Sequence, residues 1–170
     1  MNDMDNDLKN RKPNRYKGFD YSASGAYFLT ICTHNRQKNL STIVGGDVLD
    51  APKVQLLPCG RIAEKYLNQL SDFYDNVTVE RYVIMPNHIH FILLVSNDGA
   101  SRTSPPTRQH ATVSSFVSTF KRFCDKEIGQ NVWQRNFHDH VIRSLDEHNE
   151  YVRYIFENPR RWELDELYSE

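Results

Sequence analysis

The sequence has 170 residues, of which 39% are hydrophobic and 25% charged, with a formal net charge of −1. This length and composition suit one globular domain, and the near-zero charge means that an anionic partner must meet a local patch. No signal peptide begins the chain, and no run approaches the ~20 apolar residues of a membrane span, so we expect no membrane partner. The three cysteines are too far apart for a metal or redox motif, which favours reduced thiols in a cytoplasmic protein.

The polar first twenty residues predict a partly disordered arm, followed by a single domain over residues 21–165. The arm carries a cluster of cations that includes Arg15 and Lys17. This cluster is either a solvated tail or an arm that contacts phosphates, and the sequence leaves both interpretations open.

The remaining chain alternates between strand-like and helix-like patterns. Segments rich in β-branched and aromatic residues predict strands over 26–34, 76–85, 88–95 and 132–144. Apolar residues at helical spacing predict helices over 57–74, 112–129 and 145–158, with Pro58 at the first start, Gly129 closing the second and Pro159 ending the third. Residues 35–56 predict a small hairpin, and 96–110 a long polar loop.

Taken in order, these elements read β, helix, β, β, helix, β, helix. That is the order of the ferredoxin-like split-βαβ fold of the α+β class, with one helix added at the C-terminal end. We therefore expect a largely antiparallel sheet with helices on one face. Fold alone assigns no function.

The stretch "MPNHIHFILL" places two histidines inside an apolar run. In a strand, His88 and His90 point to one side of the sheet, while Ile89 and Phe91 point to the other side and into the core. The histidines are then expected on the face without helices, close enough to bind one cation. The alternative is a histidine pair without a role, and "FHDH" repeats the same spacing later in the chain, at His138 and His140.

A two-histidine metal site needs further ligands. Asp125, Asp139 and Glu80 are candidates. So are Tyr154 and Asn158, which lie four residues apart on the last predicted helix and therefore share one of its faces. Oxygen and imidazole ligands together suit Mg²⁺ or Mn²⁺. The alternative is that Tyr154 only packs its helix against the sheet.

Four segments together resemble a known family: "YVIMPNHIHFILLV", "FVSTFKRF", "VWQRNFHDHVIR" and "YVRYIFENPRRW". Their order and spacing are similar to those of the single-tyrosine HUH transposases, and most of all to the REP-associated tyrosine transposase branch of the IS200-like family. That branch has a His-hydrophobic-His motif, a Trp-Gln block and a Tyr-Ile-x-x-Asn-Pro ending. The resemblance spans about residues 15 to 162.

The resemblance implies a metal-dependent endonuclease and strand transferase that acts on single-stranded or hairpin DNA. It implies that His88 and His90 bind Mg²⁺ or Mn²⁺, that Asn158 is the third ligand, and that Tyr154 is the nucleophile that forms a 5′-phosphotyrosine bond. Members of the family act as homodimers or as monomers, so the oligomeric state stays open.

Several cations are candidates for DNA contacts: Lys121, Arg122, Arg135 and Arg143, besides Arg15 and Lys17 in the arm. For Lys121 and Arg122, ordinary solvation at the surface is at least as good an interpretation as DNA contact. Two other functions remain open, which are a DNA-hairpin-binding protein without cleavage activity and a rolling-circle-type initiator nuclease. The complete set of two histidines, tyrosine and asparagine disfavours the first, and the short chain disfavours the second.

Overall fold

The computed structural model describes residues 24–45, 51–96 and 112–168. The expected N-terminal arm, with Arg15 and Lys17, and most of the expected polar loop lie outside the described residues. Within the described residues, every predicted helix and strand is present, although some bounds differ.

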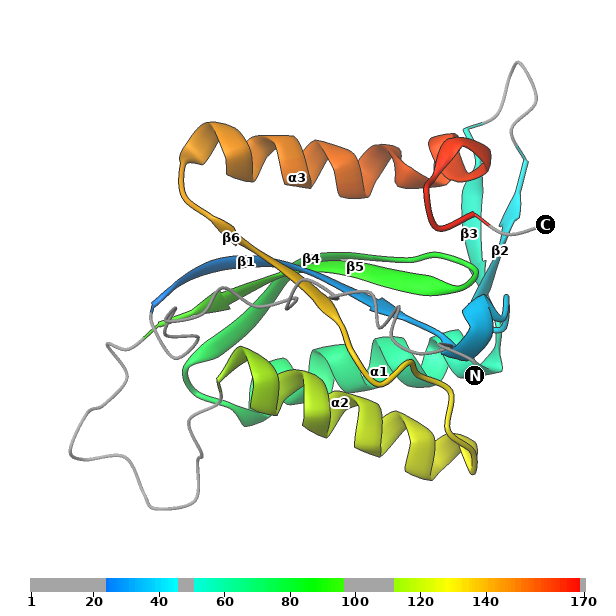
Figure 1. Ribbon diagram of the computed structural model, residues 1–170, viewed down its shortest axis with the longest axis horizontal. Coiled ribbons are helices and arrows are strands. Elements are labelled where there is room, and N and C mark those ends of the chain that lie inside the picture. The colour runs from blue at the N-terminus through cyan, green and yellow to red at the C-terminus, as the bar shows by residue number, and fades with distance from the viewer. Residues whose placement is uncertain (1–23, 46–50, 97–111, 169–170) are drawn as a thin grey trace, which may run out of the picture.

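Four antiparallel strands form the central sheet in the order β4-β5-β1-β6 (Figure 1). This order is the one that the split-βαβ connection produces, because the first helix carries the chain from β1 to β4, which leaves a place for β5 between them, and the second carries it from β5 across β1 to β6. The predicted ferredoxin-like fold is therefore confirmed. The strands are β1 (Gly25–Cys32), β4 (Val77–Ile84), β5 (His88–Val95) and β6 (His138–Ile142).

Two helices, α1 (Pro58–Phe73) and α2 (Val113–Ile128), pack side by side on one face of the sheet (Figure 1). Proline stands in the first turn of α1, where its missing N–H costs no hydrogen bond. At the end of α2, Gly129 adopts a left-handed conformation with φ 83°, as the sequence predicts. The larger core lies between these helices and the sheet and includes the inward-facing Ile89, Phe91 and Leu93 of β5.

A third helix, α3 (Leu145–Glu157), covers the other face of the sheet and continues directly into η2 (Asn158–Leu164) (Figure 1). A second, smaller core forms beneath it, with Phe28, Ile92, Ile155 and Trp162 among its buried residues. The expectation that the two histidines occupy a face without helices is therefore wrong. The order of the elements does not determine which face an added helix covers.

Two smaller features complete the fold. Strands β2 (Ser41–Val44) and β3 (Lys53–Leu56) form the expected hairpin as a separate two-stranded sheet. The predicted strand over 132–144 is shorter than expected, since β6 begins only at His138. Trp133 makes an isolated bridge to Thr33 and is buried against Phe120, so the start of that segment is aromatic because it packs in the core.

Candidate functional site

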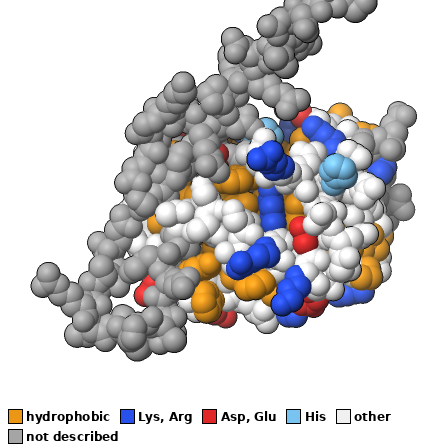
Figure 2. All heavy atoms as spheres, turned by 60° about the horizontal axis from the view of Figure 1, so that its bottom comes forward, with side chains coloured by type: hydrophobic (Ala, Val, Ile, Leu, Met, Phe, Trp, Pro, Cys, Tyr) orange, Lys and Arg blue, Asp and Glu red, His pale blue; other side chains and the backbone are white. Residues whose placement is uncertain are grey.

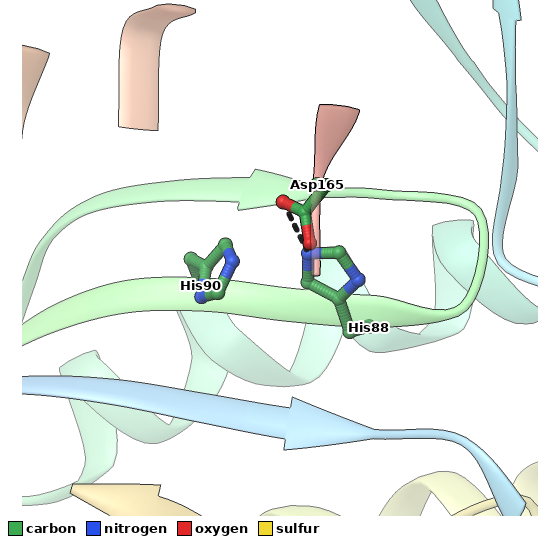
Figure 3. A group of neighbouring side chains, drawn as sticks. All are labelled: His88, His90 and Asp165. Atoms are coloured by element: carbon green, nitrogen blue, oxygen red, sulfur yellow. Dashed lines mark ion pairs between the residues drawn. The ribbon is translucent and has the colours of Figure 1, made fainter. Parts of the chain in front are cut away.

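Strand β5 presents His88 and His90 to the layer of α3 and η2 (Figure 3). The two side chains point the same way because residues two apart in a strand share a face. Both are buried, with exposed fractions of 0% and 3%, and their ring centroids are 4.4 Å apart. Burial disfavours the charged imidazolium, so it lowers the pKa of His90 and lowers the pKa of His88 to about 3, to which the nearby charge of Arg36 also contributes.

Each ring has a hydrogen-bonding partner at Nδ1. The His90 Nδ1 lies 2.8 Å from the hydroxyl of Thr30, and the His88 Nδ1 lies 2.8 Å from Oδ1 of Asn87. With the hydrogen on Nδ1, each Nε2 keeps its lone pair, which is the form in which histidine binds a metal. Thr30 pairs directly with His90 across β1 and β5, so the sheet register itself positions this contact. Sequence reasoning missed both partners, although Thr30 lies at an alternating position of its strand.

Helix α3 brings Tyr154 and Asn158 to the histidines. The Tyr154 hydroxyl lies 3.4 Å from Nε2 of His90, and the two rings meet edge to face. Burial of the hydroxyl, together with the negative charge of Asp165, raises the pKa of Tyr154 to about 12. The residue as a whole remains 37% exposed, so its hydroxyl reaches His90 while the residue stays open to solvent. The predicted group of four residues therefore assembles within a single chain.

Asp165 is a fifth member that sequence reasoning missed. It follows η2, its side chain is 4% exposed, and its Oδ2 lies 4.0 Å from Nε2 of His88 (Figure 3). The same oxygen accepts a hydrogen bond from Nδ2 of Asn158 at 3.0 Å and a weaker one from Tyr154 at 3.4 Å. Its other oxygen accepts from the backbone N–H of Leu167. No periodic pattern extends beyond Pro159 to place this carboxylate.

The donor set fits a divalent cation. His88, His90 and Asp165 each offer a ligand atom, and these atoms lie within 4.8 Å of one another. In the described part of the chain, Nε2 of His88 and Oδ1 of Asn158 are buried atoms without a hydrogen-bond partner. The distance of 4.0 Å between Nε2 of His88 and Oδ2 of Asp165 is too long for a hydrogen bond. It suits two ligands that each lie about 2.1 Å from one shared cation. Imidazole with carboxylate or amide oxygens matches the predicted Mg²⁺ or Mn²⁺ better than a thiolate metal.

A pocket of about 580 Å³ opens onto this group. Its walls come from the sheet, from the turn after β1 and from the segment after α3. The residues that line it include Thr30, Arg36, His90, His138, Tyr154, Asn158, Arg161 and Asp165. The pocket therefore gives access from solvent to His90, Tyr154, Asn158 and Asp165.

The other candidates of the sequence lie outside this group. Tyr151, the other tyrosine of α3, also lies outside it and stacks on Phe28, with ring centroids 4.3 Å apart. Asp125 accepts a hydrogen bond from the backbone of Val132, and Glu80 bonds to His148. Asp139 projects from β6 on the side opposite to His138, since residues alternate along a strand.

Lys121 differs from the other predicted DNA-binding cations. Its ammonium group is bound to the backbone carbonyls of Gln134 and Asn136 at 2.8 and 2.9 Å, and burial lowers its pKa to about 8. This geometry favours a structural role in holding the segment before β6. Arg122, Arg135 and Arg143 are at the surface, and none of them lines the pocket. Figure 2 shows Lys and Arg side chains in a row among hydrophobic ones, on the face at the bottom of Figure 1.

Two sequence-based expectations concern the environment of the protein. All three cysteines are free thiols, as expected, and Cys32 and Cys124 are buried. Among the described residues, no helix combines the length and the apolar character that crossing a membrane requires.

Comparisons with known proteins agree with the motifs. No model of a known protein family matches the chain. An uncharacterized protein of Haemophilus influenzae is 28% identical over 176 residues, which cover 95% of this chain and 94% of the relative. Another protein of the same organism, a "putative REP-associated tyrosine transposase", is 26% identical over 160 residues, which cover 82% of this chain and 73% of the relative.

A solved structure of a REP-associated tyrosine transposase bound to a REP hairpin superposes on this chain with a TM-score of 0.57 and 20% sequence identity. The superposition covers 80% of this chain and 67% of the other. The predicted fold and the predicted resemblance are thus confirmed, and the likeness supports a transposase role.

Proposed function

We propose that this chain is a metal-dependent, single-tyrosine endonuclease and strand transferase for single-stranded DNA, of the REP-associated tyrosine transposase kind. The observation that carries the proposal is the convergence of Tyr154 with the histidine pair. A phenol from α3 meets the imidazole of His90 from β5 at one pocket, with the buried imidazole of His88, Asn158 and Asp165 beside them. These elements are distant in sequence, and packing alone does not require such a set of side chains.

The proposed reaction exchanges one phosphodiester for another. The Tyr154 oxygen attacks the phosphorus, a bond forms between them, and the bond from phosphorus to the 3′-oxygen breaks. The 3′-oxygen leaves as a hydroxyl group, and the phenol loses its proton. A phenol whose pKa is about 12 is a poor nucleophile at neutral pH, so the proton must pass to a nearby acceptor as attack proceeds. Oδ2 of Asp165, 3.4 Å away, accepts a hydrogen bond from this hydroxyl and orients it, and the proton that the phenol releases is balanced by the one that the leaving 3′-oxygen takes up.

His88, His90 and Asp165 would hold Mg²⁺ or Mn²⁺, with the amide oxygen of Asn158 as a further donor. When bound, the divalent cation polarises the phosphate and offsets the charge that develops on it. The protein's own contribution is to keep both imidazoles neutral by burial and to orient them through Thr30 and Asn87. Because the proposed reaction replaces one phosphodiester by another, it conserves the energy of that bond, and the strand can be rejoined without ATP.

The proposed substrate is hairpin-bearing single-stranded DNA. The solved REP-associated transposase is bound to a REP hairpin, and the similar fold here extends that substrate class to this chain as a proposal. Tyr154 reaches the histidines of its own chain, so the site is complete without a second copy. A homodimer therefore stays a prediction that the chemistry does not require.

A covalent-adduct assay tests the proposal. The protein is incubated with a pool of single-stranded DNA hairpins and Mn²⁺ or Mg²⁺, and denaturing gels are examined for a protein–DNA adduct. We expect an adduct with wild type and none with Tyr154→Phe or with a chelator present.

Tyr151→Phe is the matched control, because it removes a hydroxyl from the same helix and keeps a ring that stacks on Phe28. It is expected to form the adduct. If Tyr154→Phe and wild type give the same adduct, Tyr154 is not the nucleophile. If hairpins bind but no variant forms an adduct under any condition, the chain is a hairpin-binding protein without cleavage activity.

A further inference from the structure

Two arginines from distant parts of the chain line the pocket beside Tyr154. Arg36 ends the turn η1 (His34–Arg36) that follows β1, and Arg161 lies in η2. Both segments lie at the same end of the molecule (Figure 1), and Nη1 of Arg36 donates to the backbone carbonyl of Glu166 at 3.3 Å. A strand that enters the pocket toward Tyr154 therefore comes to both segments that carry these guanidinium groups.

The backbone at Arg36 is in a conformation that arginine rarely adopts. Asn35 and Arg36 have φ angles of 52° and 54°, in the left-handed region that glycine occupies at low cost and asparagine tolerates. The turn is nevertheless held firmly. The backbone N–H of Thr33 donates to the carbonyl of Asn87 at 2.9 Å, and the Thr33 hydroxyl lies 2.9 Å from the carbonyl of Gln37. Non-glycine residues held in this way are found at functional sites more often than elsewhere.

The hydrogen bond between Thr33 and Asn87 fixes the position of Arg36 relative to β5, the strand of the two histidines. Asn87, which receives the bond from Thr33, directly precedes His88 in the turn that opens β5. The turn of Arg36 and the strand of the histidines are thus joined by backbone hydrogen bonds. Glycine would fit the backbone of position 36 better than arginine does, so the side chain, rather than the backbone conformation, explains the residue found there.

The charges of the pocket suit a phosphate beside Tyr154. Among the described residues that line the pocket, Arg36 and Arg161 carry a fixed positive charge, and Asp165 and Glu166 carry the negative charges. As the Tyr154 oxygen adds to a phosphate, negative charge accumulates on its non-bridging oxygens. A guanidinium group offers these oxygens two parallel N–H donors and keeps its charge at every accessible pH. Such preorganised donors lower the energy of the transition state.

We propose that Arg36 binds the non-bridging oxygens of the phosphate that Tyr154 attacks, and that Arg161 binds an adjacent phosphate of the same strand. This inference rests on the proposed function for its reaction. Its binding part, in which both arginines meet phosphates of a single strand, stands independently of cleavage.

Salt-dependent binding tests that part. The affinity of the full-length protein for a short labelled oligothymidylate is measured without added metal over a range of salt concentrations. Removing one cation that pairs with a phosphate of a single strand reduces the slope of log affinity against log salt by about 0.7. Arg36→Ala and Arg161→Ala are each expected to show this reduction, while Arg36→Lys keeps the wild-type slope because it keeps the charge.

The matched control is Arg160→Ala, which removes an equal charge from the neighbour of Arg161 that does not line the pocket. Its slope is expected to equal that of wild type. Unchanged slopes for Arg36→Ala and Arg161→Ala, or an equal reduction for Arg160→Ala, would overturn the binding part. Because no cleavage is involved, this result does not depend on the outcome for Tyr154.

The adduct assay at saturating DNA tests the catalytic part. Arg36→Ala is expected to slow adduct formation by on the order of 10²- to 10³-fold, the usual effect when one preorganised donor to a developing anion is removed. Arg36→Lys recovers only part of this rate, since a lysine cannot donate in the bidentate geometry.

Arg36→Gly separates function from structure. It is expected to melt at or above the wild-type temperature, because glycine relieves the left-handed backbone, and yet to form the adduct as slowly as Arg36→Ala. A merely structural arginine would give the opposite pattern, with a lower melting temperature and wild-type adduct formation. That pattern would refute the catalytic part.

Discussion

The chain contains the His-x-His spacing twice, on the two strands that flank β1. His88 and His90 belong to β5, which is paired on both sides, while His138 and His140 belong to β6, at the edge of the sheet. The register places Thr30 opposite both His90 and His138, so the two pairs face the same side. Their burial differs sharply, because the pair on β5 is enclosed by α3 and η2 and the pair on β6 is exposed.

The partners of the two pairs differ as well. The rings on β5 have neutral hydrogen-bonding partners at Nδ1, and the buried carboxylate of Asp165 lies near the Nε2 side of the pair. On β6, His140 bonds to Glu147 at the surface, and its side chain is 47% exposed. The surface contact links α3 to the edge of the sheet. The buried arrangement instead brings together nitrogen and oxygen atoms whose lone pairs can bind a metal ion. The same motif therefore becomes a candidate metal site or a surface pair according to what covers it.

The largest expected difference between the pairs is in metal binding. His90→Ala removes a ligand, so it is expected to abolish the stabilisation that Mn²⁺ gives to the folded protein. For wild type at a hundred times the dissociation constant, that stabilisation is about 2.7 kcal/mol. His138→Ala should keep it. Thermal melting with and without Mn²⁺ measures both variants, and circular dichroism confirms that each is folded. Retention by His90→Ala together with loss by His138→Ala would reverse the assignment.

A smaller effect separates the two candidate oxygen ligands of the buried pair. Asp165→Asn keeps the shape of the side chain but removes its charge, so Mn²⁺ affinity is expected to fall. Loss of a residue that only hydrogen-bonds to a metal ligand typically costs roughly 10- to 100-fold in affinity, and loss of the ligand's charge should cost at least as much. Asn158→Ala is expected to cost less, because a neutral amide is the weaker donor. Titration calorimetry of both variants measures the order. The reverse order would make Asn158 the principal oxygen ligand, as the family resemblance implies.

Sequence reasoning named most residues of the candidate site because two periodicities were strong. The alternation in β5 separates His88 and His90 from Ile89 and Phe91, and the spacing of four residues places Asn158, at the C-terminal cap of α3, on the same face as Tyr154. Neither periodicity could identify which histidine pair is the candidate metal site. That choice depended on the resemblance to a family and, in the structure, on the burial that α3 creates.

The features that the sequence did not reveal depend on the tertiary path of the chain. Beyond Pro159 the chain follows η2 and turns back, and this turn alone brings Asp165 to the histidines. Lys121 interrupts an apolar stripe and therefore resembles a surface cation, but its acceptors are backbone carbonyls that no residue pattern records. The strained turn at Arg36 was equally hidden, since nothing in "THNR" specifies a positive φ.

The smallest expected effect tests the exposed pair. Glu147→Gln removes the charge that meets His140, but surface ion pairs contribute little because water and salt screen them and ordering the side chains costs entropy. The amide oxygen of glutamine can still accept from the backbone N–H of Arg143, which Glu147 accepts now. Melting temperature and Mn²⁺ binding should therefore both match wild type, at low and at high salt. Loss of Mn²⁺ binding in this variant would couple the edge pair to the buried one and remove the distinction between them.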